Sequence, residues 1–247
     1  MGRYDLLICD IDGCLAPETS EPMNIEKLSL IADHNRLATA RQDRPIITLC
    51  SGRPIPFVET LCRVLQNTTV PCVAENGVWL YDPSNNGYAM DESIGPDEVK
   101  MVHAAEQRMM ELYHEHGVRI QPGKSASLSL YHPDPNYLES IAPAVEKEFH
   151  SQGWPLRVSL TLFYINCDFS QISKATGIRR LLSQTGIDAH RTAGIGDTSS
   201  DLGIAEMVET FGCPSNAIAS VKAAADFISE HEQIDGVLDF IQHLESN

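Results

Sequence analysis

The first apolar segment of the chain, Leu6–Cys9, ends in two carboxylates separated by one residue, Asp10 and Asp12, followed by Gly13. A segment this short and apolar is typical of a buried strand in a parallel sheet. Residues i and i+2 of an extended segment point the same way, so we expect both carboxylates to face one ligand at the strand's carboxyl end. Two converging carboxylates repel unless a cation or a shared proton stabilises them. The pattern therefore indicates a metal site or an acid–base pair, although Asp and Gly are also common in ordinary turns.

Strand-like and helical segments alternate at both ends of the chain. Apolar segments of strand length occur at 6–9, 45–50, 72–74, 192–195 and 211–213. Helical spacing of apolar residues occurs at 25–42, 55–66, 172–185, 202–209, 217–225 and 236–244. A turn signal at 75–77 followed by the apolar residues 78–81 predicts a hairpin-like extension. This alternation predicts an α/β protein built on a doubly wound, Rossmann-like parallel sheet.

The middle of the chain follows a different pattern. A turn-rich stretch, 82–87, precedes a long helix at about 96–116. Beyond this helix, strand-like segments are expected at 128–131 and 161–167, and a second helix is expected at 136–152. Polar and apolar residues alternate over 127–131, as in a sheet with one solvated face. We expect an inserted α+β cap domain over residues 82–168, and a core formed by residues 1–81 and 169–247.

Composition narrows the classes of partner. The 247 residues carry a formal net charge of −16, which argues against nucleic acid or an anionic membrane as the main partner. A small anionic substrate would need local cations, such as Arg53, Lys174 or a bound metal. No apolar stretch approaches the roughly 20 residues of a membrane span. The scattered cysteines fit buried reduced thiols, and no secretory segment precedes the first strand, so we expect a cytoplasmic protein. Nothing in the sequence indicates an oligomeric state.

Polar motifs also follow two other apolar segments. Ser51-Gly52-Arg53 follows the segment at 45–50, where a hydroxyl and free backbone N–H groups would form a cradle for phosphate oxygens. The alternative is a simple helix cap by Ser51. Gly196–Asp201 follows the segment at 192–195 and brings two carboxylates four residues apart, more than one acidic helix cap requires. Lys174 lies near the start of a helix, where the helix dipole disfavours a cation. This position indicates a functional role if the amine pairs with a carboxylate or a phosphate.

These motifs come from distant parts of the chain, yet all should meet at one edge of the sheet. Two of the strand ends are acidic, and one carries a hydroxyl and a glycine. Oxygen ligands favour a hard cation, and Mg²⁺ with carboxylates and waters fits best. The combination is far more specific than any one of its parts.

In these motifs the chain resembles the haloacid dehalogenase superfamily, in the phosphatase branch with a large α/β cap. The four motifs occur in the family's order, as Asp10–Cys14, Ser51–Arg53, Lys174 and Gly196–Asp201. Within this branch the chain is most similar to archaeal-type phosphoglycolate phosphatases, and then to sucrose-phosphate and mannosyl-phosphoglycerate phosphatases. The supporting stretches are Leu49–Gly52 with Ile55-Pro56, Glu75–Gly77 and Cys213–Ala217.

The resemblance implies a mechanism with two catalytic carboxylates. Asp10 would attack phosphorus and form an aspartyl-phosphate. Asp12 would protonate the leaving alkoxide and then deprotonate the hydrolytic water. Mg²⁺ would be held by the Asp10 carboxylate, the Asp12 backbone carbonyl and Asp197, with Asp201 assisting directly or through a neighbouring ligand.

The same resemblance assigns the phosphoryl oxygens to Ser51, the Gly52 N–H and Lys174. Specificity should lie in the cap, which closes over the site. Three further side chains are expected near the substrate: Arg53, Lys124 and Ser125. For the cap pair, a solvated loop is an equally good interpretation.

We therefore expect a Mg²⁺-dependent phosphomonoester hydrolase that acts on a small phosphorylated metabolite, with phosphoglycolate favoured. A sugar-phosphate phosphatase of the sucrose-phosphate or mannosyl-phosphoglycerate type is the first alternative. A phosphomutase, which would return the phosphoryl group to the sugar, and a non-catalytic phosphometabolite-binding protein are the others. An intact pair of carboxylates in the first motif argues against pure binding.

Overall fold

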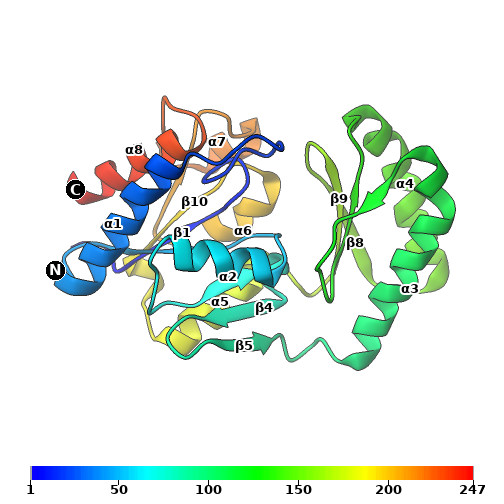
Figure 1. The fold of residues 1–247 in the computed structure, drawn as a ribbon, viewed down its shortest axis with the longest axis horizontal. Helices are drawn as coiled ribbons and strands as arrows, with labels where there is room; N and C mark the ends of the chain where they lie inside the picture. Colours follow the sequence, from blue (N-terminus) through cyan, green and yellow to red (C-terminus); the bar gives the residue numbers. More distant parts are fainter. Residues whose placement is uncertain (1, 247) are drawn as a thin grey trace.

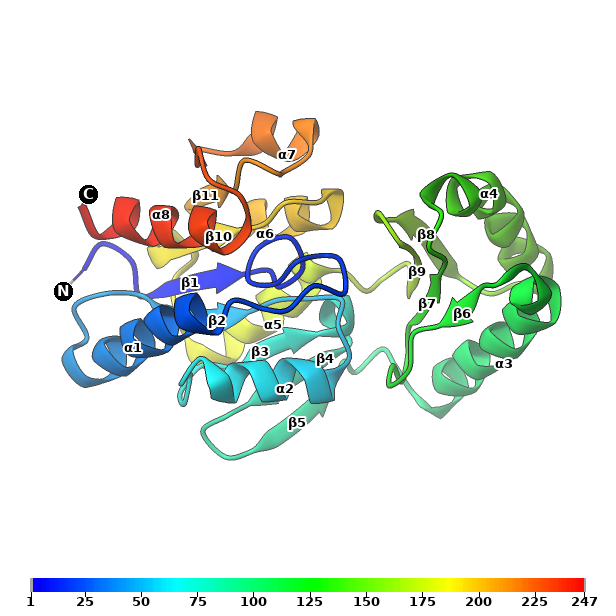
Figure 2. The same cartoon turned by 45° about the horizontal axis from the view of Figure 1, so that its top comes forward.

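A five-stranded parallel sheet forms the centre of the computed structural model, which describes residues 2–246. Its strand order is β12-β11-β10-β1-β2, and every neighbouring pair is parallel. The bounds are β1 Leu6–Cys9, β2 Ile46–Leu49, β10 Thr192–Ile195, β11 Thr210–Cys213 and β12 Phe227–Ile228. Because β1 lies between β2 and β10, its carboxyl end has a neighbouring strand end on each side (β1 and β10 are labelled in Figure 1, and all three strands in Figure 2).

Helices cover both faces of this sheet, as the doubly wound prediction requires. The helices are α1 Ile25–Arg41, α2 Ile55–Val64, α5 Lys174–Thr185, α6 Leu202–Ala205, α7 Ala219–Ala224 and α8 Gln233–Ser246. Leu7 and Cys9 of β1 belong to the apolar cluster with α1, α2 and α8, whereas Leu6 and Ile8 belong to the cluster with α5, α6 and α7. Alternate residues of one buried strand therefore serve two apolar layers, which explains why the strand is apolar throughout.

A three-stranded antiparallel sheet extends the core and confirms the expected hairpin. It consists of β3 Cys72–Ala74, β4 Trp79–Asp82 and β5 Gly87–Met90, and β3 joins β2 through a bridge between Val73 and Cys50. A turn of 3-10 helix, Glu75–Gly77, connects β3 to β4. The division of the chain at residues 82 and 168 stays a prediction; β5, which follows residue 82, pairs with β4 of this sheet.

The cap consists of two helices packed on an antiparallel sheet. Helices α3 Pro96–Tyr113 and α4 Pro135–Gln152 cover one face of a sheet in the order β6-β7-β9-β8. The strands are β6 Arg119–Ile120, β7 Leu128–Tyr131, β8 Leu156–Leu160 and β9 Tyr164–Phe169. Both helices lie on the side away from the core, so the other face of the sheet looks toward the core (Figure 2).

Several boundaries differ from the sequence prediction. The helix expected at 202–209 ends at Ala205, because Glu209 already donates its N–H to Thr192 O as the chain enters β11. The strand expected at 161–167 is β9, at Tyr164–Phe169, and the short or mixed-polarity strands β5, β6, β8 and β12 escaped prediction.

The cysteines agree with the expectation of buried, reduced thiols. All seven cysteines are buried and free of disulfide bonds. Among residues 2–246, no helix has both the length and the apolar character that crossing a membrane would require.

Candidate active site

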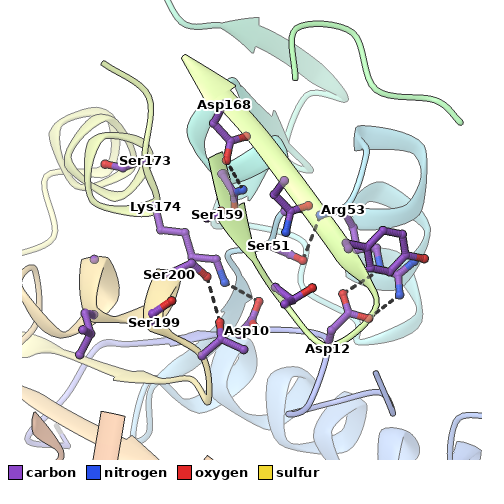
Figure 3. A pocket seen from close by; sticks show the side chains of 18 of the residues that line it. Asp10, Asp12, Ser51, Arg53, Ser159, Asp168, Ser173, Lys174, Ser199 and Ser200 are labelled. Atoms are coloured by element: carbon purple, nitrogen blue, oxygen red, sulfur yellow. Dashed lines mark hydrogen bonds and ion pairs between the residues drawn. The ribbon is translucent and has the colours of Figure 1, made fainter. Parts of the chain in front are cut away.

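The carboxyl ends of three neighbouring strands bring the expected motifs together. Asp10 directly follows β1, whereas one residue separates Ser51 from the end of β2 and Asp197 from the end of β10. The Asp10 N–H donates to Ile195 O at 3.1 Å, which continues the β1–β10 pairing to the site. A pocket of about 450 Å³ opens here between the core and the cap, and Asp10, Ser51 and Lys174 line it (Figure 3).

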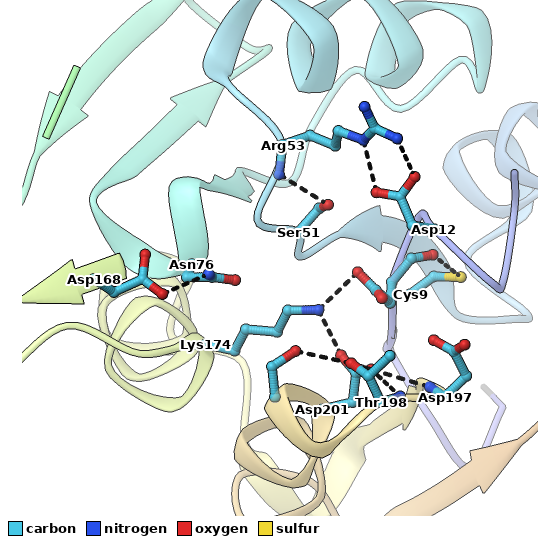
Figure 4. Close-up of polar contacts among 12 residues, drawn as sticks. Cys9, Asp12, Ser51, Arg53, Asn76, Asp168, Lys174, Asp197, Thr198 and Asp201 are labelled. Carbon is cyan, nitrogen blue, oxygen red and sulfur yellow. Dashed lines mark hydrogen bonds and ion pairs between the residues drawn. The ribbon is translucent and has the colours of Figure 1, made fainter. Parts of the chain in front are cut away.

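Three buried carboxylates share the floor of the site with one ammonium group. Oxygens of Asp10, Asp197 and Asp201 all lie within 4.8 Å of one another. Lys174 Nζ lies 2.7 Å from Asp10 Oδ1 (labelled in Figure 3) and 2.5 Å from Asp201 Oδ1 (Figure 4). All four side chains are buried. Burial and the Asp201 charge raise the pKa of Asp10, while the two carboxylates hold Lys174 in its charged form. The position of Lys174 at the start of α5 is thus explained by these partners.

The negative charge of this cluster exceeds what Lys174 balances. Burial and the charges of Asp10 and Asp201 raise the pKa of Asp197 to about 9. Asp197 Oδ1 is also buried without a hydrogen-bond partner among the described residues. An orphaned carboxylate oxygen within a set of oxygen donors fits a hard divalent cation.

Asp201 organises the loop that carries Asp197. Its Oδ2 accepts hydrogen bonds from the N–H of Asp197 at 3.0 Å, and from the N–H and hydroxyl of Thr198 at 2.8 and 3.0 Å. With Oδ1 paired to Lys174, both oxygens of Asp201 have partners. Its contribution to a metal site would therefore be mainly to position Asp197.

Two residues beside Asp197 complete its surroundings. Gly13 has a φ of +75°, and a Cβ at this position would overlap the Asp197 carboxylate. Only glycine allows both the turn and the close approach. Asn216 donates from Nδ2 to Gly13 O at 3.0 Å and to Asp197 Oδ2 at 3.3 Å. Asn216 lies in a stretch that supported the family resemblance, but sequence reasoning gave it no role.

Asp12 lies apart from the carboxylate cluster and pairs with Arg53. The Arg53 guanidinium donates to both Asp12 oxygens, from Nε at 2.7 Å and from Nη2 at 2.5 Å. Both side chains line the pocket and remain partly exposed. Arg53 therefore lies at the pocket, and its partner there is Asp12.

The Ser51-Gly52 turn lies opposite the carboxylate cluster. Ser51 is buried, its Oγ accepts the Arg53 N–H at 3.2 Å, and its carbonyl accepts the Asn76 N–H at 3.0 Å. The Asn76 side chain lies against Gly52, where a Cβ would come within 3.1 Å of Asn76 Oδ1. The helix α2 begins four residues after Ser51, at Ile55, so Ser51 does not cap it.

The structure places Lys124 and Ser125 behind the pocket and not in its lining. Ser125 donates from its N–H and Oγ to the buried Glu75 and accepts from Trp79 Nε1 at 2.6 Å. Lys124 Nζ donates to Ser129 Oγ at 2.6 Å. The Ser125 contacts link the cap to the core, whereas the Lys124 bond lies within the cap. Both differ from the solvated loop that was the alternative interpretation.

Sequence reasoning missed the polar residues of the cap sheet that line the pocket. Arg157 and Ser159 of β8 face Asp168 and Asn166 of β9 in register. All four line the pocket, and Asp168 accepts a hydrogen bond from Asn76 Nδ2 at 2.9 Å. Their alternation at i and i+2 is the signal that would have found them, once β8 was recognised as a strand.

Comparisons with known proteins agree with this geometry. A family model described as haloacid dehalogenase-like hydrolase matches residues 7–120 and 118–241, so the chain belongs to that family. It is 24% identical over 240 residues to a phosphoglycolate phosphatase of Methanospirillum hungatei, which covers 96% of this chain and 94% of that protein. A phosphoglycolate phosphatase of Methanothrix thermoacetophila is 34% identical over 104 residues, 41% of this chain and 46% of its own length.

Solved structures match the whole fold. A Thermoplasma acidophilum protein superposes with a TM-score of 0.75 at 19% identity, covering 98% of both chains. A sugar phosphatase of haloacid dehalogenase subclass IIB superposes with a TM-score of 0.66 at 18% identity, covering 97% of this chain and 98% of that one. At these identities the likeness concerns the fold, and it confirms the predicted core-and-cap architecture.

Proposed function

We propose that this protein is a Mg²⁺-dependent phosphatase that hydrolyses a small phosphomonoester through an aspartyl-phosphate. The observation that carries the proposal is the position of Asp10. It lies at the carboxyl end of β1, 2.7 Å from Lys174 Nζ and in one carboxylate cluster with Asp197 and Asp201. Family membership supports hydrolytic chemistry, and the phosphatase names of the relatives support this particular hydrolysis.

In this proposal Asp10 attacks the phosphorus atom and displaces the alcohol. An ionised carboxylate is the nucleophile, and Lys174 favours that form through its ion pair. Ser51 Oγ, the Gly52 N–H and Lys174 bind the phosphoryl oxygens, whose charge grows in the transition state. The site is buried, so these fixed donors act in a low-dielectric environment where they are more effective than water.

Asp12 acts as general acid and then as general base. Its proton goes to the leaving oxygen, and it later accepts a proton from the water that cleaves the aspartyl-phosphate. Both Asp12 oxygens are held by Arg53, so proton transfer requires one oxygen to leave the guanidinium. Arg53 thereby orients the carboxylate between turnovers and is positioned to meet the substrate.

Asp10 and Asp197 would hold the metal through carboxylate oxygens and Asp12 through its backbone carbonyl, with Asp201 assisting. Bound there, Mg²⁺ supplies positive charge to the phosphoryl group and to the crowded carboxylates. The unpartnered Asp197 oxygen and the raised pKa of that residue support this assignment.

Phosphoglycolate is the favoured substrate, because the relatives that span most of the chain carry that name. A sugar phosphate is the second candidate, favoured by the hydrogen-bonding face of the cap sheet, where Ser159, Asn166 and Asp168 suit hydroxyl groups. Protection of the aspartyl-phosphate from water would make the protein a mutase, and loss of turnover would make it a binding protein. A cytoplasmic location is consistent with seven free thiols and stays a prediction.

Phosphate release from a panel of phosphomonoesters, with and without Mg²⁺, tests the proposal. The panel contains phosphoglycolate, sucrose phosphate and hexose phosphates, and the proteins are wild type, Asp10→Asn and the exposed control Asp33→Asn. We expect Mg²⁺-dependent release by wild type and the control, and none by Asp10→Asn. Transfer of labelled phosphate between sugar positions would instead identify a mutase, and Mg²⁺ binding without release would identify a binding protein.

A further inference from the structure

A short hydrogen-bond chain in the cap ends at the pocket. Lys124 Nζ donates to Ser129 Oγ at 2.6 Å, and Ser129 Oγ donates to Asn166 Oδ1 at 2.5 Å. Ser129 of β7 and Asn166 of β9 are register partners, so the sheet itself holds the last link. Ser129 is fully buried, while Asn166 is partly exposed and lines the pocket.

The chemistry of the first link sets the direction of the whole chain. An ammonium group donates and never accepts, so Ser129 Oγ accepts from Lys124 and has its own proton left to donate. Burial lowers the pKa of Lys124, but the carboxylates of Asp168 and Glu75 oppose this shift and favour the ammonium form. The Ser129 proton must then point to an acceptor, and the acceptor in reach is Asn166 Oδ1.

The orientation of the Asn166 amide follows. With Oδ1 turned to Ser129, the amide nitrogen carries two protons away from β7, and no hydrogen-bond partner for this nitrogen occurs among residues 2–246. Ser159 and Arg157 of β8 lie beside Asn166 along the same edge of the pocket. Arg157 is opposite Asp168 in register, and its positive charge opposes the rise that burial causes in the pKa of Asp168.

We propose that Asn166 is a specificity-determining residue, whose amide N–H donates to an acceptor oxygen on the organic part of the substrate. Lys124 and Ser129 are positioning residues that keep the amide in this orientation. The inference rests on the proposed phosphatase function and deepens it. It assigns the substrate to phosphomonoesters with a carboxylate, carbonyl or hydroxyl oxygen beyond the ester carbon, and it gives Lys124 a role without contact to the substrate.

Matched esters test this inference. Phosphoglycolate and ethyl phosphate share the two-carbon chain and differ in the carboxylate; glycerol 3-phosphate and propyl phosphate share three carbons and differ in the hydroxyls. Values of kcat and KM are measured for wild type, Asn166→Ala, Ser129→Ala and the exposed cap control Asn136→Ala, each checked for folding by thermal melting. We expect wild type to prefer the oxygen-bearing ester of at least one pair by about 10- to 100-fold in kcat/KM.

Asn166→Ala should remove this preference through KM, and leave kcat and the reaction of the plain alkyl ester unchanged. Ser129→Ala should weaken the preference in part, because the amide is then free to turn, and Asn136→Ala should keep it. Equal loss on both members of a pair, a preference that survives Asn166→Ala, or no preference in wild type would overturn the inference while the proposed function stands. Release from none of the four esters would count against the proposed function itself.

Discussion

Replacement of Gly13 by alanine separates two effects that the structure assigns to this position. The first is conformational, because an L-residue in the left-handed region costs about 1–2 kcal/mol. The second is steric, because the new Cβ meets the carboxylate of Asp197. Gly186 is the matched control: its φ is +71°, close to the +75° of Gly13, and a Cβ there meets no atom within 4 Å.

The size of the steric effect follows from the distances. Asp197 Cγ lies 2.5 Å and Oδ1 2.9 Å from the ideal Cβ position, whereas ordinary contact begins at 3.4 Å. Asp197 Cγ must therefore move by at least 0.9 Å, the difference between 3.4 and 2.5 Å. Mg²⁺ accepts little deviation from its ligand distances of about 2.0–2.1 Å, so such a shift removes a ligand or leaves it poorly placed.

Urea unfolding and Mg²⁺ titration calorimetry measure the two effects. Gly186→Ala should lower the free energy of unfolding by about 1 kcal/mol and leave Mg²⁺ affinity unchanged. Gly13→Ala should lower Mg²⁺ affinity by at least about tenfold. Wild-type Mg²⁺ affinity in Gly13→Ala, with stability equal to that of Gly186→Ala, would refute the steric argument and the metal-binding role of Asp197.

The surroundings of Asn216, Lys174 and His34 predict three further effects. Asn216→Ala should weaken Mg²⁺ binding by about 10- to 100-fold, because Asp197 loses the amide that orients it, and calorimetry on the folded variant measures this. Lys174→Met should lower the unfolding free energy without Mg²⁺ by about 3–5 kcal/mol, because two buried carboxylates lose their counter-charge; saturating Mg²⁺ should restore part, and full stability without Mg²⁺ would contradict the ion-pair account. Burial lowers the pKa of His34 below its ordinary value of 6.5, so its neutral form stabilises the fold above that pH and this contribution is lost as the pH falls further. Denaturation of wild type between about pH 7.5 and pH 5.5 should therefore show a steeper loss of stability than His34→Gln, and parallel curves would contradict the assignment.

The core could be predicted from the sequence because its signals are local and strong. Leu6–Cys9 and Thr192–Ile195 are apolar throughout, which indicates strands buried on both faces, and each ends in a carboxylate. Adjacent parallel strands align their carboxyl ends, so the meeting of Asp10, Ser51 and Asp197 follows from topology alone. The structure and the family match support this part of the prediction.

The cap could not be predicted to the same depth, because its functional residues depend on register between strands. β8 contains Arg157 and Ser159, whose polarity hides a strand in a sequence profile. Lys124 and Asn166 are 42 residues apart, and only the pairing of β7 with β9 connects them through Ser129. The Arg53–Asp12 pair was missed for a similar reason, since a contact between two loops leaves no periodic signal.

The measurement that tests the central claim most directly is the detection of a phosphoryl group on Asp10. Asp12→Asn removes the base that deprotonates the hydrolytic water, so the aspartyl-phosphate should accumulate. An ester with a good leaving group, such as p-nitrophenyl phosphate, needs no acid for the first step. We expect this variant, quenched in acid during turnover with Mg²⁺, to show the mass of one phosphoryl group on the peptide that contains Asp10, and the Asp10→Asn/Asp12→Asn double variant to show none. Phosphate release by the wild type with no label on Asp10 in the trapped variant, or full activity of Asp10→Asn, would contradict the account.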